Sequence, residues 1–277
     1  MTRHRIAYVT GELLPDDPDL DLEWALEAFA KRSVTCQVHR WDADVEWAAF
    51  DAALIRSPWD YHRRRDEFLA WADRAATVTT MHNPPQVMRA NTHKSYLLDL
   101  AAAGVPVIPT TLLRPGHPDW QPGDQRVVVK PAVSAGAADT VLSTGASARA
   151  HADWLLAAGR DVLVQPYLAE VEDPGEVAVV FIDGAISHAV RKVPALTVGG
   201  HGDPDALVPV TEDLAAAAHR VIEAASAQEL LFARVDLVPV AHQWLLLELE
   251  LTEPTLFLEQ HPAAAEALAD GLLRRLR

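Results

Sequence analysis

Four charged residues near the end of the chain alternate with aliphatic ones in a pattern that indicates chemistry. Arg234 and Asp236 occupy one apolar run, and Glu248 and Glu250 occupy the next. On a β-strand this period-two spacing puts each pair on a single face. Neighbouring carboxylates repel unless a cation lies between them, and Mg²⁺ prefers oxygen ligands and commonly binds together with nucleotide phosphates. Asp236, Glu248 and Glu250 are therefore predicted to hold a metal ion beside a phosphate compound.

The two runs are expected to form a hairpin, and the length of its connection decides which charged residues meet. A three-residue loop sets Asp236 opposite Glu248. It also sets Arg234 opposite Glu250. A two-residue loop sets Asp236 opposite Leu247 instead, because a one-residue slip moves every side chain to the other face. The alternative interpretation is a hairpin whose solvent face carries ordinary cross-strand ion pairs.

The elements that must position these residues predict an α/β chain. In the first third, strands at 5–10, 33–41, 52–57 and 77–81 alternate with helices at 19–32 and 66–75. Such alternation indicates a parallel sheet, and ligands of parallel sheets gather at the carboxyl ends of the strands. A set of residues at one such end is predicted to bind substrate: Arg56, Trp59, Asp60 and Tyr61. The alternative is a loop that its aromatic rings merely anchor.

The rest of the chain predicts a mixture of helices and antiparallel strands. Helices are expected at 91–103, 147–158, 211–225 and 262–276, and strands at 126–130 and 162–165. A hairpin of 176–182 and 185–191 is expected to turn at Asp183-Gly184, since Asp-Gly is a preferred tight turn. The predicted domains are residues 1–88, 89–164 and 165–277, and a mobile loop is expected at 197–203.

Composition narrows the class of protein. The chain has 277 residues and a net charge of −15, which argues against nucleic acid or an anionic membrane as a partner. Its single cysteine, Cys36, excludes an internal disulfide and a cysteine-based zinc site. The first apolar run, at 6–9, is only as long as a strand, so we expect no signal peptide and a cytoplasmic protein. A homodimer is a candidate state.

A lysine and a loop of small residues supply the second half of a phosphate site. Lys130 ends a predicted strand, and the small-residue loop 132–140 follows it. Short side chains let backbone N–H groups approach phosphate oxygens, and a nearby lysine adds positive charge. The chain contains neither the Walker pattern nor the dinucleotide glycine fingerprint. The lysine, the loop and the later acidic pair, in that order, carry the prediction.

Taken in order, these motifs resemble the ATP-grasp superfamily along essentially the whole chain. The matching pieces are Asn91-Thr92-His93-Lys94, Val127 to Pro131, Ser134 to Thr140, Val162 to Leu168, Glu176 with Arg191, and the Arg-x-Asp…Glu-x-Glu pair. The last segment resembles that of glutathione synthetases, with Glu250 in place of Asn and Glu253 in place of Ser. Within the superfamily the chain is most similar to ligases related to O-ureido-serine cyclo-ligase. Residues 56–61, 83–85, 189–194 and 247–254 carry that similarity.

The resemblance implies an ATP-grasp fold, with an N-terminal parallel α/β domain and two α+β subdomains that clamp ATP. It implies phosphate contacts from Lys94 and Lys130, and one or two Mg²⁺ ions, with Mn²⁺ as an alternative. The other nucleotide-binding residues that it implies are Ser134, Ala135, Gly136, Gln165, Tyr167, Leu168 and Glu176. It assigns catalytic roles to Arg191, Arg234 and Lys130. Gly200 and Glu253 join the candidate substrate-binding residues.

The activity that follows is an ATP-dependent carboxylate–amine ligase. The family's reaction makes an acyl phosphate, here on a small amino acid or its derivative, which an amine then attacks in an amide-forming or cyclising step. Two other functions stay open: a catalytically silent ATP-binding module, and a phosphotransferase that stops at the phosphorylated product. Removal of a carboxylate at Asp236 or Glu248 is expected to abolish ADP formation. By relieving repulsion, it is also expected to maintain or raise stability without metal.

Overall fold

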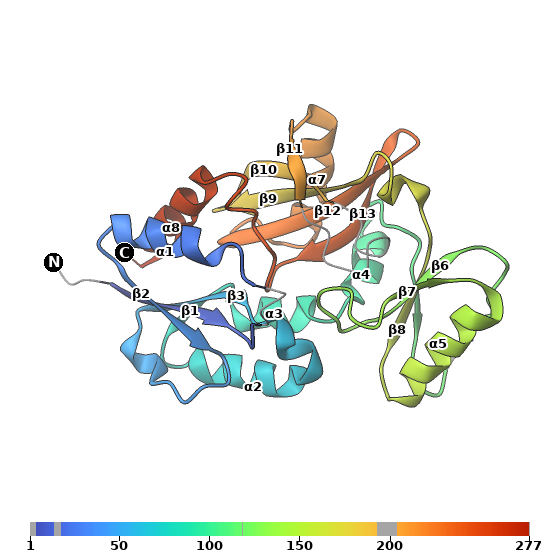
Figure 1. Ribbon diagram of the computed structural model, residues 1–277, viewed down its shortest axis with the longest axis horizontal. Helices are drawn as coiled ribbons and strands as arrows, with labels where there is room; N and C mark the ends of the chain where they lie inside the picture. Colours follow the sequence, from blue (N-terminus) through green and yellow to red (C-terminus); the bar gives the residue numbers. More distant parts are fainter. Residues whose placement is uncertain (1–3, 14–17, 118, 193–203, 277) are drawn as a thin grey trace.

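Three β-sheets form the framework of the computed structural model, which describes residues 4–13, 18–117, 119–192 and 204–276 (Figure 1). The first sheet is parallel, with the strand order β2-β1-β3-β4. Its strands are β1 (Arg5–Thr10), β2 (Thr35–Arg40), β3 (Ala52–Ser57) and β4 (Thr80–His82). The predicted parallel α/β unit is confirmed, and the carboxyl end of β3 leads directly into the candidate loop that begins at Trp59.

The second and third sheets are antiparallel. The central sheet has the order β5-β8-β6-β7, and the C-terminal sheet has the order β11-β10-β9-β12-β13. The central strands are β5 (Thr111–Leu113), β6 (Val127–Pro131), β7 (Val141–Ser143) and β8 (Val162–Pro166). The C-terminal strands are β9 (Glu176–Ile182), β10 (Ala185–Lys192), β11 (Pro204–Val208), β12 (Phe232–Val240) and β13 (Gln243–Glu250). The sequence patterns did not predict the short strands β5, β7 and β11.

The helices agree with the predicted positions except around Lys94. They are α1 (Leu22–Lys31), α2 (Arg65–Ala75), α3 (Pro85–Asn91), α4 (Tyr96–Ala102), α5 (Gly145–Ala157), α7 (Glu212–Ala224) and α8 (Ala263–Arg275). Single 3₁₀ turns are η1 (Trp47–Ala49), η2 (Trp59–Arg63) and η3 (Ala169–Val171). The single helix expected at 91–103 is wrong: Lys94 lies in the link between α3 and α4.

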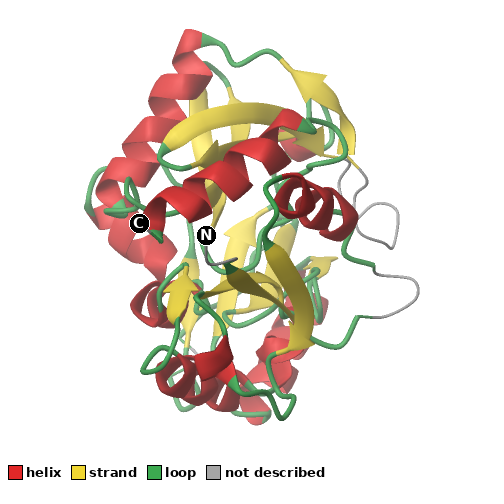
Figure 2. Cartoon of the chain, turned by 90° about the vertical axis from the view of Figure 1, so that its left-hand side faces the viewer, coloured by secondary structure: helices red, strands yellow, loops and turns green. Residues whose placement is uncertain are grey.

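The N-terminal and C-terminal sheets share one hydrophobic core. Ile6, Tyr8 and Leu54 of the first sheet pack in the same cluster as Val180 and Phe232 of the third. Helices α1 and α8 lie side by side along this junction, while the central sheet and α5 project to the other side (Figure 1). Seen from the side of α1 and α8, most helices lie outside the strands (Figure 2). The shared core fixes the first and third sheets relative to each other.

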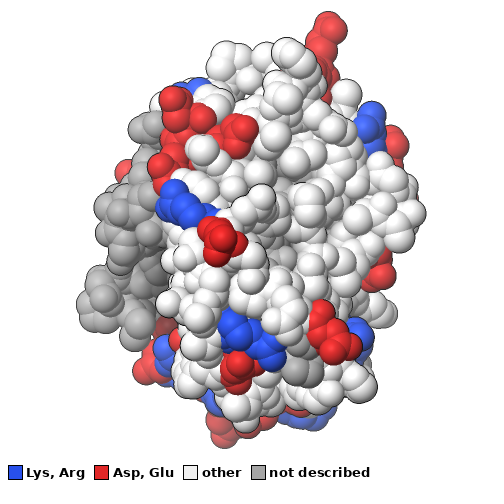
Figure 3. All heavy atoms as spheres, turned by 90° about the vertical axis from the view of Figure 1, so that its right-hand side faces the viewer, with Lys and Arg blue, Asp and Glu red and all other residues white. Residues whose placement is uncertain are grey.

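The domain limits at 1–88, 89–164 and 165–277 stay a prediction, and the limit at 164/165 falls inside β8. No helix within the described ranges is long and apolar enough to cross a membrane. On the face shown in Figure 3, lysine and arginine side chains lie singly or in small groups beside acidic ones. The loop predicted at 197–203 and its Gly200 lie outside the described residues.

Two histidines, the partly buried His82 and the buried His188, make stability depend on pH. Burial lowers the pKa of each imidazole from 6.5 to about 4. Below pH 6.5 the unfolded chain therefore binds protons that the folded chain does not, and stability falls as the pH is lowered towards 4.

We expect His188→Gln to remove about 2 kcal/mol of this loss between pH 7.0 and pH 4.5, as measured by urea unfolding at pH 7.0, 5.5 and 4.5. The exposed His117 provides the control substitution, His117→Gln, measured under the same conditions. An unaltered slope in His188→Gln would contradict the assignment.

Candidate active site

The hairpin of β12 and β13 brings the four charged residues together, but by a different route from the one predicted. Val240 pairs with Gln243, so the connection has two residues rather than three, and that prediction is wrong. A β-bulge then shifts the register between Asp236 and Leu237. Asp236 consequently lies opposite Glu248, as predicted, because the bulge adds one residue to β13 and reverses the slip.

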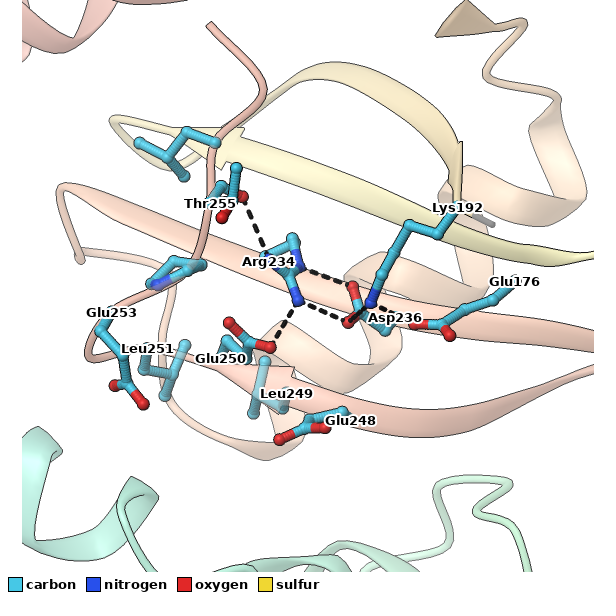
Figure 4. A network of polar contacts seen from close by, with 12 residues as sticks. Glu176, Lys192, Arg234, Asp236, Glu248, Leu249, Glu250, Leu251, Glu253 and Thr255 are labelled. Atoms are coloured by element: carbon cyan, nitrogen blue, oxygen red, sulfur yellow. Dashed lines mark hydrogen bonds and ion pairs between the residues drawn. The ribbon is translucent and has the colours of Figure 1, made fainter. Parts of the chain in front are cut away.

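Arg234 forms the centre of the charge cluster. Its Nε and Nη2 atoms each donate to the Asp236 carboxylate at 2.8 Å, and Nη2 also pairs with Glu250 (Figure 4). Its Nη1 atom donates to the backbone oxygen of Thr255 at 3.2 Å. The predicted pairing of Arg234 with Glu250 across the hairpin is confirmed. The cation between the carboxylates is thus a guanidinium of the same hairpin.

Lys192 of β10 supplies a second cation, which the sequence patterns did not single out. Its Nζ atom lies 2.6 Å from Glu176 and 2.9 Å from Asp236. Arg191, the residue predicted to be catalytic, is exposed and lies with its aliphatic carbons against Gly175. The β9–β10 turn of two residues would pair Glu176 with Arg191, but a register shift between Ile186 and His188 pairs Glu176 with Lys192.

The surrounding charges set the ionisation of these carboxylates. Burial opposes the charge of Asp236, but Arg234 and Lys192 outweigh it and hold its pKa well below the ordinary range. Burial likewise opposes the charge of Glu248, and Lys94 with Lys130 nevertheless lowers its pKa. At Glu250 burial prevails and raises the pKa to about 8.

Lys94 contacts Glu248, and Lys130 lies near enough to influence the same carboxylate electrostatically. The Lys94 Nζ atom lies 2.9 Å from Glu248 and donates to the backbone oxygen of Ser134 at 2.8 Å. Burial lowers the pKa of Lys130, and the neighbouring Glu248 counteracts this effect. Both lysines are only 8% exposed, which makes their charges effective on any anion that enters.

The small-residue loop begins at this pair of lysines. Ser134 is buried, Ala135 is partly exposed and Gly136 is exposed. Gly136, Ala137 and Asp139 have φ angles of 58°, 57° and 56°, so the loop turns back on itself repeatedly. The Asp139 carboxylate pairs with Arg160 at 2.6 Å, which ties the far end of the loop to the residues just before β8.

The predicted adenine residues lie at the connection from the central to the C-terminal sheet. The side-chain amide of Gln165 donates to the Thr110 hydroxyl at 2.9 Å. The Arg126 guanidinium lies 4.0 Å from the centre of the Tyr167 ring. Leu168 immediately precedes η3 in extended backbone. Glu176 is buried and faces Lys192, so burial and this ion pair oppose each other in setting its pKa, which is raised.

The N-terminal loop residues divide into structural and site-facing ones. The buried Arg56 guanidinium binds Asp21 and the backbone oxygen of Pro254, at 3.1 and 2.6 Å. The Asp60 carboxylate accepts from Trp41 Nε1 and Arg64 Nη2, both at 3.0 Å. These contacts hold both charged residues within the fold, although the buried Nε and Nη1 atoms of Arg56 have no hydrogen-bond partner among the described residues.

The other two loop residues contact the segment that follows β13. The Trp59 indole donates to the backbone oxygen of Glu253 at 3.1 Å, and the Tyr61 hydroxyl hydrogen-bonds to the Glu253 carboxylate. Sequence reasoning also missed Asn83 and Asn91, whose amides bind backbone groups of Leu251 from two sides. The only signal was their place beside Pro84 and Lys94 in the resembling segments.

Comparison with known proteins agrees with this geometry. Residues 6–83 match the family model described as the N-terminal domain of D-cycloserine synthetase DcsG. The chain is 36% identical to the cycloserine biosynthesis protein DcsG of Streptomyces lavendulae, over 94% of this chain and 95% of that protein. The chain belongs to the DcsG family of ATP-grasp ligases.

Solved structures place this DcsG-family ligase in the same fold. The crystal structure of D-cycloserine synthetase DcsG matches with a TM-score of 0.88 and 34% identity, over 99% of this chain and 100% of that one. D-Alanine–D-alanine ligase from Bacillus anthracis, complexed with ATP, matches with a TM-score of 0.67 and 13% identity, over 99% and 97% of the two chains. The predicted ATP-grasp fold and the predicted ligase class are confirmed.

The donor atoms fit the metal of an ATP-grasp ligase. Asp236, Glu248 and Glu250 offer carboxylate oxygens, the ligands that Mg²⁺ prefers. Among the described residues, no group of three or more histidine, cysteine, aspartate or glutamate side chains is arranged to hold a metal ion. Mg²⁺ usually keeps waters and takes phosphate oxygens as ligands, so an incomplete protein set fits this ion.

We expect Asp236→Asn to abolish ADP formation and also to destabilise the apo protein, by about 3 kcal/mol. From the sequence alone, stability without metal is expected to hold or rise. The two ion pairs of Asp236 instead make a loss the expected result, because the change leaves Arg234 and Lys192 without their buried partner. Chemical unfolding without metal measures the effect. Asp66→Asn, on the exposed first turn of α2, is the control, and equal stability of the two variants would contradict the prediction.

Lys192 and Arg191 form a matched pair of neighbouring cations on β10. Lys192→Met should reduce ADP formation at least about 100-fold, a loss typical of a charge-stabilising group, whereas Arg191→Met should retain near-normal turnover. The measurement is coupled ADP release under saturating ATP and Mg²⁺. The opposite ranking would return the catalytic role to Arg191.

Proposed function

We propose that this ATP-grasp ligase activates the carboxylate of a small amino-acid derivative as an acyl phosphate and then closes it into a ring. The γ-phosphoryl group of ATP is transferred to a carboxylate oxygen and ADP is released. A nitrogen of the same substrate attacks the acyl carbon, loses a proton and displaces phosphate. The similarity to proteins named for cycloserine synthesis supports an O-substituted serine, such as O-ureido-serine, as the substrate.

The observation that carries this proposal is the ion pair between a lysine assigned to the phosphates, Lys94, and a carboxylate assigned to the metal, Glu248. Lys94 lies 2.9 Å from Glu248, and both side chains would change partners when a nucleotide enters. The lysine would then face phosphate oxygens, and the carboxylate would face Mg²⁺. This exchange replaces one set of ion pairs by another, so binding does not leave a buried charge unpaired.

Each part of the site has a role in this mechanism. Mg²⁺, or Mn²⁺ in its place, would neutralise phosphate charge while held by Asp236, Glu248 and Glu250. We assign the ATP phosphates to Lys94, Lys130 and the loop of Ser134, Ala135 and Gly136. The adenine group is assigned to the connection formed by Gln165, Tyr167 and Leu168, and the ribose to Glu176.

The cations deepest in the cluster would act on the acyl group. Arg234 and Lys192 lie on either side of Asp236, in the buried part of the site. A positive charge fixed in a poorly hydrated place stabilises the negative charge that grows on the transferring phosphoryl group and on the tetrahedral carbon oxygen. Catalysis would then consist of positioning and electrostatics, without a protein nucleophile.

The surface charges on one face of the molecule agree with a small-molecule substrate. Lysines and arginines on the face of Figure 3 are interspersed with acidic side chains, which gives a nucleic acid no extended basic surface there. A homodimer and a cytoplasmic location stay predictions from the sequence.

The first experiment incubates the protein with ATP, Mg²⁺ and O-ureido-serine, without any added amine. We expect ADP and phosphate in equal amounts, together with a product whose mass is lower than that of the substrate. Asp236→Asn is the inactive control.

Other results would support the competing functions. A product that retains the phosphoryl group indicates a phosphotransferase. Turnover only after an amine is added indicates joining of two substrates. Tight ATP binding with no ADP release across a panel of amino acids and O-substituted serines indicates a silent module.

A further inference from the structure

Glu253 differs from the other carboxylates of the site because it lacks a cationic partner. Each of the others forms an ion pair: Asp236 with Arg234 and Lys192, Glu248 with Lys94, Glu250 with Arg234, and Glu176 with Lys192. Within the described ranges, no lysine, arginine or histidine forms an ion pair with Glu253. In Figure 4 its carboxylate lies apart from the Arg234 network, and no dashed line reaches it.

The N-terminal domain holds Glu253 in a fixed place. The hydroxyl of Tyr61, a residue only 2% exposed, hydrogen-bonds to the carboxylate. The Trp59 indole donates to the backbone oxygen of Glu253 at 3.1 Å, and Arg56 binds the next carbonyl, that of Pro254, at 2.6 Å. Backbone and side chain are therefore both anchored, while the side chain itself stays partly exposed.

The position of Glu253 places it beside the charges that would hold the nucleotide. Lys94, Glu248 and Arg234 are all close enough to influence it electrostatically. Burial is the largest influence and raises the pKa of Glu253 to about 7. A cation placed against this carboxylate would restore its charge and gain a strong, charge-assisted hydrogen bond.

The nucleotide cannot provide that cation, because its phosphates are negative and would repel Glu253. The proposed metal ligands lie on β12 and β13, whereas Tyr61 and Trp59 tie Glu253 towards the N-terminal loop. An O-substituted serine such as O-ureido-serine has one cationic group, its α-ammonium. A single carbon separates that group from the reacting carboxylate, so binding the ammonium at Glu253 would hold the carboxylate close by.

We propose that Glu253, oriented by the Tyr61 hydroxyl, binds the α-ammonium group of the substrate and thereby selects amino acids over acids that lack the amine. This inference rests on the proposed function, since it concerns the second substrate of the same reaction. Glu253 would bind the substrate directly. Tyr61 is a positioning residue that acts through it.

The test compares O-ureido-serine with its desamino counterpart, 3-(ureidooxy)propanoic acid, in wild-type protein and in Glu253→Gln. Glutamine keeps the shape and removes the charge. We expect the KM for O-ureido-serine to rise about 10- to 100-fold, the effect of losing a hydrogen bond to a charged group. Turnover of the desamino acid should be the same in both proteins. The exposed Glu223→Gln on α7 is the matched control and should behave as wild type.

Two further measurements separate a binding role from a loss of structure. ATP binding, followed by calorimetry with Mg²⁺, should be unchanged in Glu253→Gln. Tyr61→Phe should raise the same KM less than Glu253→Gln does and should leave kcat nearly unaltered.

The outcomes distinguish this inference from the proposed function. No ADP release by the wild-type protein with any amino acid or O-substituted serine would overturn the proposed function itself. If the wild type turns over O-ureido-serine and Glu253→Gln discriminates against the desamino acid as strongly as the wild type does, Glu253 does not bind the ammonium group. A variant that instead needs more Mg²⁺, with an unchanged KM for O-ureido-serine, would make Glu253 a metal ligand and overturn the inference.

Discussion

A buried carboxylate keeps its charge only beside a cation, and this requirement organises the centre of the molecule. Asp236 is completely buried and lies between Arg234 of its own strand and Lys192 of β10. Strand β9 lies between β10 and β12 and carries Glu176, the other partner of Lys192. The strand order of the C-terminal sheet thus brings both cations to Asp236. Both are needed, because removing one charge from a buried ion pair costs far more stability than removing the whole pair.

The segment that continues from β13 depends on the N-terminal domain for its position. Asp21 accepts the backbone N–H groups of Leu256 and Leu258 at 2.6 and 2.8 Å. Asn83 donates to the backbone oxygens of Phe232 and Leu251 at 2.8 and 2.7 Å. These bonds recognise backbone rather than side chains, so they locate the segment whatever its sequence. The N-terminal domain therefore shapes the active site mainly through polar side chains that bind the other domain's main chain.

The sequence predicted which charged residues lie together better than it predicted the turn lengths and the strand registers. The alternating charges on β12 and β13 predicted the charge cluster around Arg234, because the direction of a side chain on a strand follows directly from its spacing. Bulges follow from packing instead, and each of the two hairpins combines a two-residue turn with one shifted register. In one hairpin the shift made the pairing of Asp236 with Glu248 correct although the predicted loop was wrong. In the other it exchanged Arg191 for Lys192. Backbone contacts such as those of Asn83 join distant segments and leave no local pattern.

The pairing of charges also explains how one site can hold an anionic nucleotide and still choose its second substrate. Lys94 pairs with Glu248, and Lys130 also favours its charge, so phosphates and a metal ion would replace that pairing without leaving either charge alone. Glu253 takes no part in this exchange, since its contact is a tyrosine hydroxyl. The nucleotide would offer it no cation, because phosphate oxygens would add negative charge nearby. In our proposal, recognition of the nucleotide and recognition of the amino-acid substrate are therefore separate. The first uses Lys94, Lys130 and the carboxylates of β12 and β13, and the second uses Glu253, which the N-terminal loop positions.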